Sequence, residues 1–207
     1  MTQFKLLIVV LCFLVLSFGC GDGGGEKFPE VNLDPAVVAG NIMAEFDKDS
    51  DGEVSKSELK KNKGLMMLTQ GEQNLQQQFR LDSDGSGGIS EEEFTKRFAE
   101  CFKDKRQGYN CTVMLRNVPL EDATVTLVPA SFMGEIPAAS GETDYDGNCS
   151  VSTPDGLAGA VPGIYTVEIT HPEKKIPAKY NDKSTIIVAL DPTNPYANEG
   201  VPTFKLR

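Results

Sequence analysis

Histidine is almost absent from this chain, whose 207 residues include a single one, His171. A Ser–His–Asp triad would have to use that residue, and no G-x-S-x-G elbow is present. The phosphate-cradling pattern G-x-x-x-x-G-K-[ST] is also missing. No two cysteines have the C-x-x-C spacing, so neither a thiol redox motif nor a cysteine-rich zinc site is supported. These absences predict a protein that is not an enzyme.

Positive charge is scarce as well, with 20 Lys and Arg residues against 30 Asp and Glu residues and a net charge of −10. Removing residues 1–19, whose only charged residue is Lys5, brings the net charge to −11. Such acidity argues against nucleic acid and against anionic lipid surfaces as partners. Much of the negative charge is concentrated in two short segments.

The first acidic segment, Asp47–Glu58 (DKDSDGEVSKSE), has the spacing of an EF-hand calcium loop. Such a loop binds Ca²⁺ through oxygens at positions 1, 3, 5, 7, 9 and 12, and a glycine at position 6 makes the sharp turn. Gly52 occupies the turn position, and Val54 at position 8 is predicted to lie in a short strand against a partner loop. The predicted ligands are Asp47, Asp49, Asp51, the backbone carbonyl of Glu53, Ser55 and Glu58, the last with both oxygens.

A second loop, Asp82–Glu93 (DSDGSGGISEEE), begins 35 residues later, at the interval that a helix–loop–helix pair requires. Gly87 takes the turn position and Ile89 the apolar one. At position 5 a serine replaces the usual Asp or Asn. The predicted ligands are Asp82, Asp84, Ser86, the backbone carbonyl of Gly88, Ser90 and Glu93.

Each loop has a simpler interpretation as a solvated acidic turn, but two matches at this interval favour a calcium-binding pair. The loops are not equivalent, since the first offers four ligand carboxylates and the second three. The glycine-rich GSGG of the second loop also adds backbone entropy that binding must remove. We therefore predict tighter calcium binding at the first loop.

Apolar residues around both loops recur every four residues, as on one face of a helix. They are Val38, Ile42 and Phe46 before the first loop, Leu75 and Phe79 before the second, and Phe94, Phe98 and Phe102 after it. Asp34 and Pro35 have the types expected at a helix start. A helix beginning inside the first loop is predicted to stop near Gly64. Core packing is the ordinary role of these apolar residues.

The N-terminal segment has the features of an export signal. Lys5 precedes an apolar run, Leu6–Phe18, that is too short to span a bilayer. The stretch LSFGC resembles the lipobox of bacterial lipoproteins, although Phe18 is bulkier than usual. The resemblance implies removal of a signal peptide, residues 1–19, lipidation of Cys20, and attachment to the cell envelope facing the periplasm or exterior. An ordinary secretory signal and a retained membrane anchor are the alternatives.

Residues 20–32 are glycine-rich and predict a flexible tether for a folded body that starts at residue 33. Cys101, Cys111 and Cys149 remain in that body, in a compartment that permits disulfides. Three cysteines allow three single bridges with one thiol left over. A Cys111–Cys149 bridge would fasten two strands, whereas a Cys101–Cys111 bridge would fasten the helical part to the segment after it.

The pattern changes near residues 107–108 from helical periodicity to short alternating β-branched runs separated by turn residues. The runs are YNCTVML, ATVTLVP, NCSVST, IYTVEIT, STIIVAL and TFKL. About seven strands in a hundred residues predict a β-sandwich. The fold class is thus α + β in two domains, an EF-hand pair in residues 33–107 and an all-β sandwich in residues 108–207.

Four segments of this half, PLEDATVTLVP, GETDYDGNCSV, GAVPGIYTVEIT and IPAKYNDKST, resemble the transthyretin-like, carboxypeptidase-regulatory-like domain. That resemblance implies a prealbumin-type sandwich that is usually non-catalytic and often an accessory or adhesion module. Transthyretin relatives include a hydrolase of 5-hydroxyisourate, whose site uses several histidines and a Tyr-Arg-Gly-Ser-like tail. This chain has one histidine and ends FKLR, so those requirements are not met.

Two functions are consistent with these features. The first is a calcium-binding, lipid-anchored envelope protein with a structural or adhesive role, whose partner would be an envelope protein or a carbohydrate. The second is a sensor in which Ca²⁺ opens the helix pair and exposes an apolar groove. Met43, Met66, Met67 and the phenylalanines would line that groove, although core packing explains them equally well.

Overall fold

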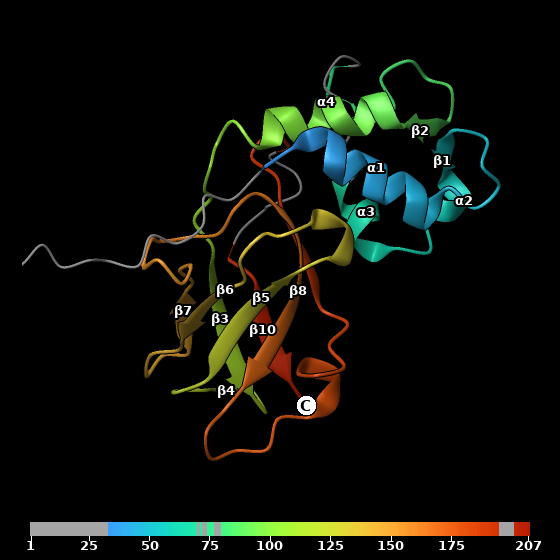
Figure 1. Cartoon of the computed structure of the whole chain (residues 1–207). Coiled ribbons are helices and arrows are strands. Elements are labelled where there is room, and N and C mark those ends of the chain that lie inside the picture. Colours follow the sequence, from blue (N-terminus) through green and yellow to red (C-terminus); the bar gives the residue numbers. More distant parts are fainter. Residues whose placement is uncertain (1–32, 70, 72–73, 77–79, 195–200) are drawn as a thin grey trace, which may run out of the picture.

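The computed structural model describes residues 33–69, 71, 74–76, 80–194 and 201–207. The predicted signal peptide, the predicted lipidation site Cys20 and the predicted tether at residues 20–32 lie outside the described residues. Within those ranges, no helix combines the length and the apolar character needed to cross a bilayer. Helices at the N-terminal end are followed by a β-rich region, as the α + β prediction requires (Figure 1).

The first helix, α1 (Pro35–Phe46), begins where the sequence predicts. The side chain of Asp34 accepts the Ala36 N–H at 2.9 Å, and Pro35 occupies the first helical position. Val38, Ala39 and Ile42 form its buried face, and α1 packs along α4 (Glu91–Cys101). The apolar stripe of α4 is likewise buried, with Phe94 and Phe98 almost inaccessible to solvent.

The segment between the loops differs from the prediction of one helix ending near Gly64. The structure has two short helices, α2 (Lys56–Leu59) and α3 (Lys63–Leu68). Asn62 separates them because its side chain accepts the backbone N–H groups of Gly64 and Leu65 and so starts a new helix. The apolar pattern of Leu75 and Phe79 predicts a helix before the second loop. The described residues between 71 and 81 contain no α-helix, and Phe79 itself lies outside the described residues.

The β-rich region forms two sheets that enclose a core. In the first, β10 (Thr203–Leu206), β3 (Asn110–Leu115) and β4 (Val118–Pro119) are neighbours in that order, and β7 (Asn148–Ser150) also pairs with β3. The second has the order β6 (Ala139–Glu142), β5 (Thr124–Pro129), β8 (Gly163–Thr170) and β9 (Ile187–Leu190). The described part of this region also contains two single-turn 3₁₀ helices, η3 (Ser131–Met133) and η4 (Ala178–Tyr180).

The strands show the predicted alternation. Along β5, Val125 and Leu127 are buried while Thr124 and Thr126 are partly exposed, and β8 alternates in the same way from Tyr165 onward. All pairings within the two sheets are antiparallel except that of β10 with β3, which is parallel. The six runs identified in the sequence coincide with β3, β5, β7, β8, β9 and β10.

Helices and sheets share one continuous apolar core. The ring of Phe46 on α1 meets the ring of Phe132 on η3 edge to face, with centroids 5.7 Å apart. Helix α3 lies on β8 and β9, where a Cβ added to Gly64 would overlap Cγ2 of Ile164. The helical part therefore packs tightly against one end of the sandwich (Figure 1).

Candidate metal centre

The two acidic loops lie side by side because short strands join them. Strands β1 (Glu53–Ser55) and β2 (Gly88–Ser90) pair antiparallel, and Val54 lies opposite Ile89 as predicted. Both apolar side chains are buried. The turn before each strand is made by a glycine with positive φ, 91° at Gly52 and 100° at Gly87, a conformation that other residues resist.

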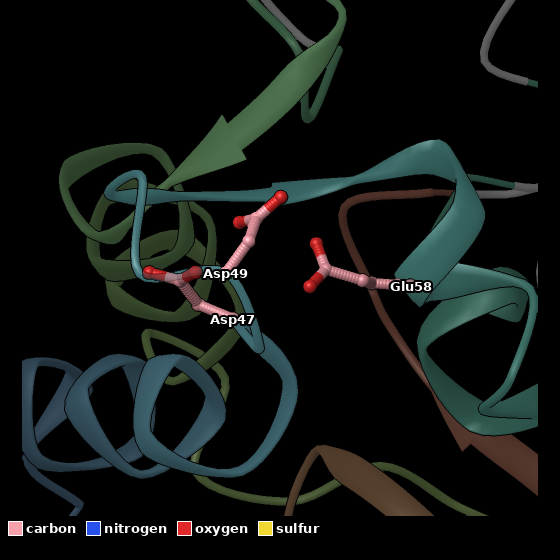
Figure 2. Close-up of side chains that lie close together, drawn as sticks. All are labelled: Asp47, Asp49 and Glu58. Carbon is pink, nitrogen blue, oxygen red and sulfur yellow. The ribbon is translucent and has the colours of Figure 1, made fainter.

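Three of the predicted carboxylates in the first loop converge. Asp47 comes after the end of α1, Asp49 lies in the loop and Glu58 projects from α2, so that Glu58 faces the two aspartates (Figure 2). One oxygen from each lies within 4.8 Å of the other two. Gathering this much negative charge is unfavourable unless a cation neutralises it.

Asp47 offers an observation that bears directly on metal binding. Its Oδ2 accepts the Gly52 N–H at 3.1 Å, but its Oδ1 is buried and has no hydrogen-bond partner. A buried carboxylate oxygen without a partner is costly, and a bound cation would remove that cost. The all-oxygen donor set fits Ca²⁺, a hard cation that prefers carboxylate and carbonyl ligands.

Glu58 is held in place and kept ionised by hydrogen bonds. Its Oε1 accepts the Lys48 N–H at 2.7 Å, and its Oε2 accepts the Ser55 hydroxyl at 2.8 Å and the Ser55 N–H at 2.9 Å. These donors, chiefly the Lys48 amide, lower the pKa of Glu58 to about 2. The side chain is only 5% exposed, so a fixed anionic ligand faces the loop.

The remaining predicted ligands of the first loop have other contacts. Asp51 is not part of the carboxylate cluster, and its Oδ1 accepts the Glu53 N–H at 3.0 Å. The hydroxyl of Ser55 lies 2.9 Å from that of Ser57 in addition to its bond to Glu58. The structure thus brings together Asp47, Asp49 and Glu58, and leaves Asp51 outside that group.

The second loop repeats this arrangement. Asp82, Asp84 and Glu93 each place a carboxylate oxygen within 4.8 Å of the others. Both oxygens of Asp82 accept backbone N–H groups, from Gly85 at 2.7 Å and from Gly87 at 3.2 Å. Asp84, at position 3, accepts the Ser86 N–H at 2.9 Å. Asp51 makes the same kind of contact two residues ahead, with Glu53, but from position 5 of its loop. Here too a cation would relieve the repulsion between the carboxylates.

Glu93 resembles Glu58 in its surroundings. Burial alone would raise its pKa, but donors from Ser90 and Ser83 outweigh that effect and lower the pKa below its ordinary value. Its Oε1 accepts the Ser83 N–H at 2.8 Å, and its Oε2 accepts the Ser90 N–H at 3.0 Å. Ser90 in turn receives the Glu93 N–H, which completes a capping box at the start of α4.

A contact between the loops was not predicted. The Ser86 hydroxyl donates to Oε2 of Glu53 at 3.3 Å, so a residue expected to contribute only a carbonyl also joins the two loops through its side chain. Gly88 makes room for it, because a Cβ there would overlap the same carboxylate oxygen. Ser86 also lies 3.4 Å from the Gly88 carbonyl, another predicted ligand. A loop motif describes only the residues of its own loop, so it gives no signal for a contact between two loops.

Helix α4 carries a second unpredicted feature, a buried ion pair with the sandwich. Arg97, one turn beyond Glu93, donates from Nη2 to Oδ2 of Asp191 at 2.7 Å, and the two side chains are 6% and 1% exposed. The thiol of Cys101 donates to the other carboxylate oxygen at 3.1 Å. The last turns of α4 are therefore fastened to the residues after β9. The calcium loop and the sandwich are connected through this helix.

The sequence also raised histidine, methionine and cysteine residues as candidates for catalysis, an apolar groove and disulfides, respectively. His171 is partly exposed, and its Nδ1 accepts the N–H groups of Glu173 and Lys174, so the ring shapes a turn. Met43 and Met67 are partly buried against the core, whereas Met66 is 38% exposed. Buried free thiols are found at Cys101, Cys111 and Cys149.

The EF hand family matches this chain twice, over residues 42–61 and residues 80–99. Each match contains one of the two acidic loops with the ends of its flanking segments. Among curated proteins, no match to the chain was found. The geometry and the family match together support calcium binding by an EF-hand pair.

Proposed function

We propose that this protein is a lipid-anchored component of a bacterial cell envelope in which calcium holds the EF-hand pair against the β-sandwich. Its role is structural or adhesive. The observation that carries the proposal is the position of the sandwich, which already covers the apolar side of the helices. Calcium in this arrangement stabilises a fixed assembly.

The covered helices favour this function over that of a sensor. A sensor EF-hand pair opens on binding Ca²⁺ and presents an apolar groove to a partner. Here Phe46 packs on Phe132 of η3, and Asn41 of α1 donates from Nδ2 to the Phe132 carbonyl at 3.2 Å. The Ser131 hydroxyl donates to the carboxylate of Glu45 at 3.1 Å on the same side. The surface that a partner would need is filled from within the chain.

The ion would supply positive charge between converging carboxylates that otherwise repel one another. The chain's own residues fix where that charge acts. Glu58 and Glu93 lie at the starts of α2 and α4, and each accepts amides from both ends of its loop. Extracellular calcium sites often bind at about 10⁻⁴–10⁻³ M, so outside the cytoplasm such sites would be filled constantly.

The anchor is proposed from the N-terminal segment. The apolar run Leu6–Phe18, the LSFGC stretch and the glycine-rich residues after Cys20 resemble those of an exported and lipidated chain. Replacement of Cys20 by serine is expected to move the protein from the membrane fraction to the soluble fraction. Retention in the membrane fraction would instead indicate an uncleaved anchor.

The sandwich is proposed to be a non-catalytic module of the transthyretin-like type that contacts an envelope protein or a carbohydrate. Its two four-stranded sheets are compatible with that assignment. The single histidine is engaged in a local turn, which supports a function other than catalysis. Nucleic acid is not expected as a partner of so acidic a chain.

Fluorescence of a dye that binds exposed apolar surface tests the proposal. The dye is expected to bind the protein in chelator and to be released when Ca²⁺ is added, because the ion closes the helices onto the sandwich. Binding that occurs only with Ca²⁺ would favour the sensor. A Glu58→Gln, Glu93→Gln double variant serves as control, since its dye signal should no longer respond to millimolar Ca²⁺.

A further inference from the structure

Two of the three buried thiols face each other between neighbouring strands. Cys111 on β3 and Cys149 on β7 are direct partners in the antiparallel register. They are 1% and 3% exposed, and the thiols are close enough to hydrogen-bond to each other. The hydroxyl of Tyr109 nearby is buried without a hydrogen-bond partner.

The backbone hydrogen bonds fix the spacing of this pair. The Val113 N–H donates to the Gly147 carbonyl at 2.8 Å, and the Val151 N–H donates to the Tyr109 carbonyl at 3.2 Å. Cys111 and Cys149 lie midway between those contacts, so they form a hydrogen-bonded pair. In such pairs the Cα atoms are about 5.5 Å apart. That separation is also the commonest one for residues joined by a disulfide.

We propose that Cys111 and Cys149 form an intramolecular disulfide that closes the chain between β3 and β7. The reaction requires a disulfide oxidant, either oxidised glutathione or an oxidised thiol–disulfide oxidoreductase. The Cys149 thiolate attacks one sulfur of the oxidant and displaces its other sulfur as a thiolate. Cys111, deprotonated, then attacks the sulfur of Cys149 and displaces the remaining oxidant thiolate. Two thiols lose two electrons and two protons, and the oxidant is reduced to two thiols.

The surroundings of Cys149 suit it to the first step. A hydrogen bond from Cys111 lowers the pKa of Cys149, and the same contact raises that of Cys111. Burial of both sulfurs denies a bulky oxidant access to the finished sandwich. The exchange therefore belongs to folding, after β7 has paired with β3 and before the rest of the sandwich covers the two sulfurs.

Cys101 lies in a different environment. Its thiol donates to Asp191 and lies 3.8 Å from the Thr193 hydroxyl, at the junction of α4 and the sandwich. Burial, followed by the charge of Asp191, raises its pKa, so it is a poor nucleophile. It is the thiol that stays reduced.

Peptide mapping tests this assignment. The full-length protein is unfolded with reductant, refolded with Ca²⁺ in a mixture of reduced and oxidised glutathione, then alkylated in denaturant and digested with trypsin. Cleavage after Lys and Arg places the three cysteines in separate peptides, residues 98–103, 107–116 and 117–174. We expect the second and third to be recovered as one linked species that dithiothreitol separates, and residues 98–103 to be alkylated.

A Cys101→Ala variant should give the same linked species, whereas Cys111→Ala should abolish it. The oxidised parent should melt about 10 °C above the reduced parent, and reductant should not change the melting temperature of a Cys111→Ala, Cys149→Ala double variant. Recovery of residues 107–116 and 117–174 fully alkylated after refolding with oxidised glutathione would overturn the proposal. A linked peptide containing Cys101 would overturn it too.

Discussion

Arg97 donates two hydrogen bonds to the same carboxylate oxygen of Asp191, from Nε at 3.2 Å and from Nη2 at 2.7 Å, although 94 residues separate them in the chain. Asp191 is held on its other side by the Thr193 amide and hydroxyl at 3.0 and 2.6 Å. Arg97 also reaches the Leu68 carbonyl at 3.5 Å, as does Nδ2 of Asn194. One ion pair therefore joins α4, the end of α3 and the segment after β9.

Replacing Arg97 with methionine is expected to lower the free energy of unfolding by about 3 kcal/mol, because it leaves the Asp191 carboxylate buried without its cation. Urea denaturation followed by circular dichroism in millimolar Ca²⁺ measures the loss. Lys103→Gln is the control, since the Lys103–Glu100 pair is largely exposed. That variant should change stability by no more than about 0.5 kcal/mol. Equal stabilities for the two variants would show that the buried pair contributes nothing.

Calcium affinity is expected to depend on the last residue of each loop. Isothermal titration of Glu58→Gln and Glu93→Gln should show a lost or weakened site in each variant, and the larger loss of affinity in Glu58→Gln. The first loop has four predicted ligand carboxylates against three in the second, so it should be the tighter site. A larger loss in Glu93→Gln would reverse the ranking.

Gly64→Ala tests the contact between helix and sandwich. In the interior of an exposed helix this change would stabilise by up to about 1 kcal/mol. Here the added methyl would overlap Ile164 on β8, so we expect destabilisation by about 1–3 kcal/mol instead. Gly40→Ala on α1 is the matched control, because a Cβ there meets only Oε1 of Glu91 at 3.6 Å. Thermal unfolding in Ca²⁺ distinguishes them, and a Gly64→Ala protein as stable as Gly40→Ala would mean the interface is loose.

Asp155 should make stability depend on pH in the acid range. The Thr153 hydroxyl, the Leu157 amide and Arg106, whose Nη2 lies 2.5 Å from Oδ2, lower the pKa of this carboxyl against the opposing effect of burial. The stabilisation is complete above the ordinary value of 3.8 and is lost as pH falls from there through the lowered pKa. The advantage of the parent over Asp155→Asn in urea denaturation should therefore shrink below about pH 4. An advantage that does not change from pH 7 to pH 2.5 would contradict this account.

The features that the sequence predicts well are local. Ligand spacing within twelve residues is enough to identify each loop, and the apolar eighth position is enough to pair Val54 with Ile89. Alternation of buried and exposed residues likewise identified six strands, although it missed the two-residue β4 and the strand β6 with its small residues. The break between α2 and α3 was missed because Asn62 acts as a cap inside a continuous helical pattern.

Contacts between distant segments could not be predicted. The bonds from Ser86 to Glu53 and from Arg97 to Asp191 depend on how the loops and sheets come together, and nothing in the neighbouring sequence marks those residues. The same holds for Phe132, whose packing on Phe46 decides whether the helices have a free apolar face. A row of apolar residues along a helix predicts that this face is buried, but it does not predict which segment of the chain covers the face.

Strand β10 pairs with one edge of β3, and its residues are of types that suit an edge strand. Pro202 immediately precedes it and the exposed Lys205 lies within it, both of which discourage strand addition by another molecule. Clipping the chain before Thr203 would uncover the longer and more apolar β3. We therefore expect removal of β10 to promote edge-to-edge association between copies of the protein.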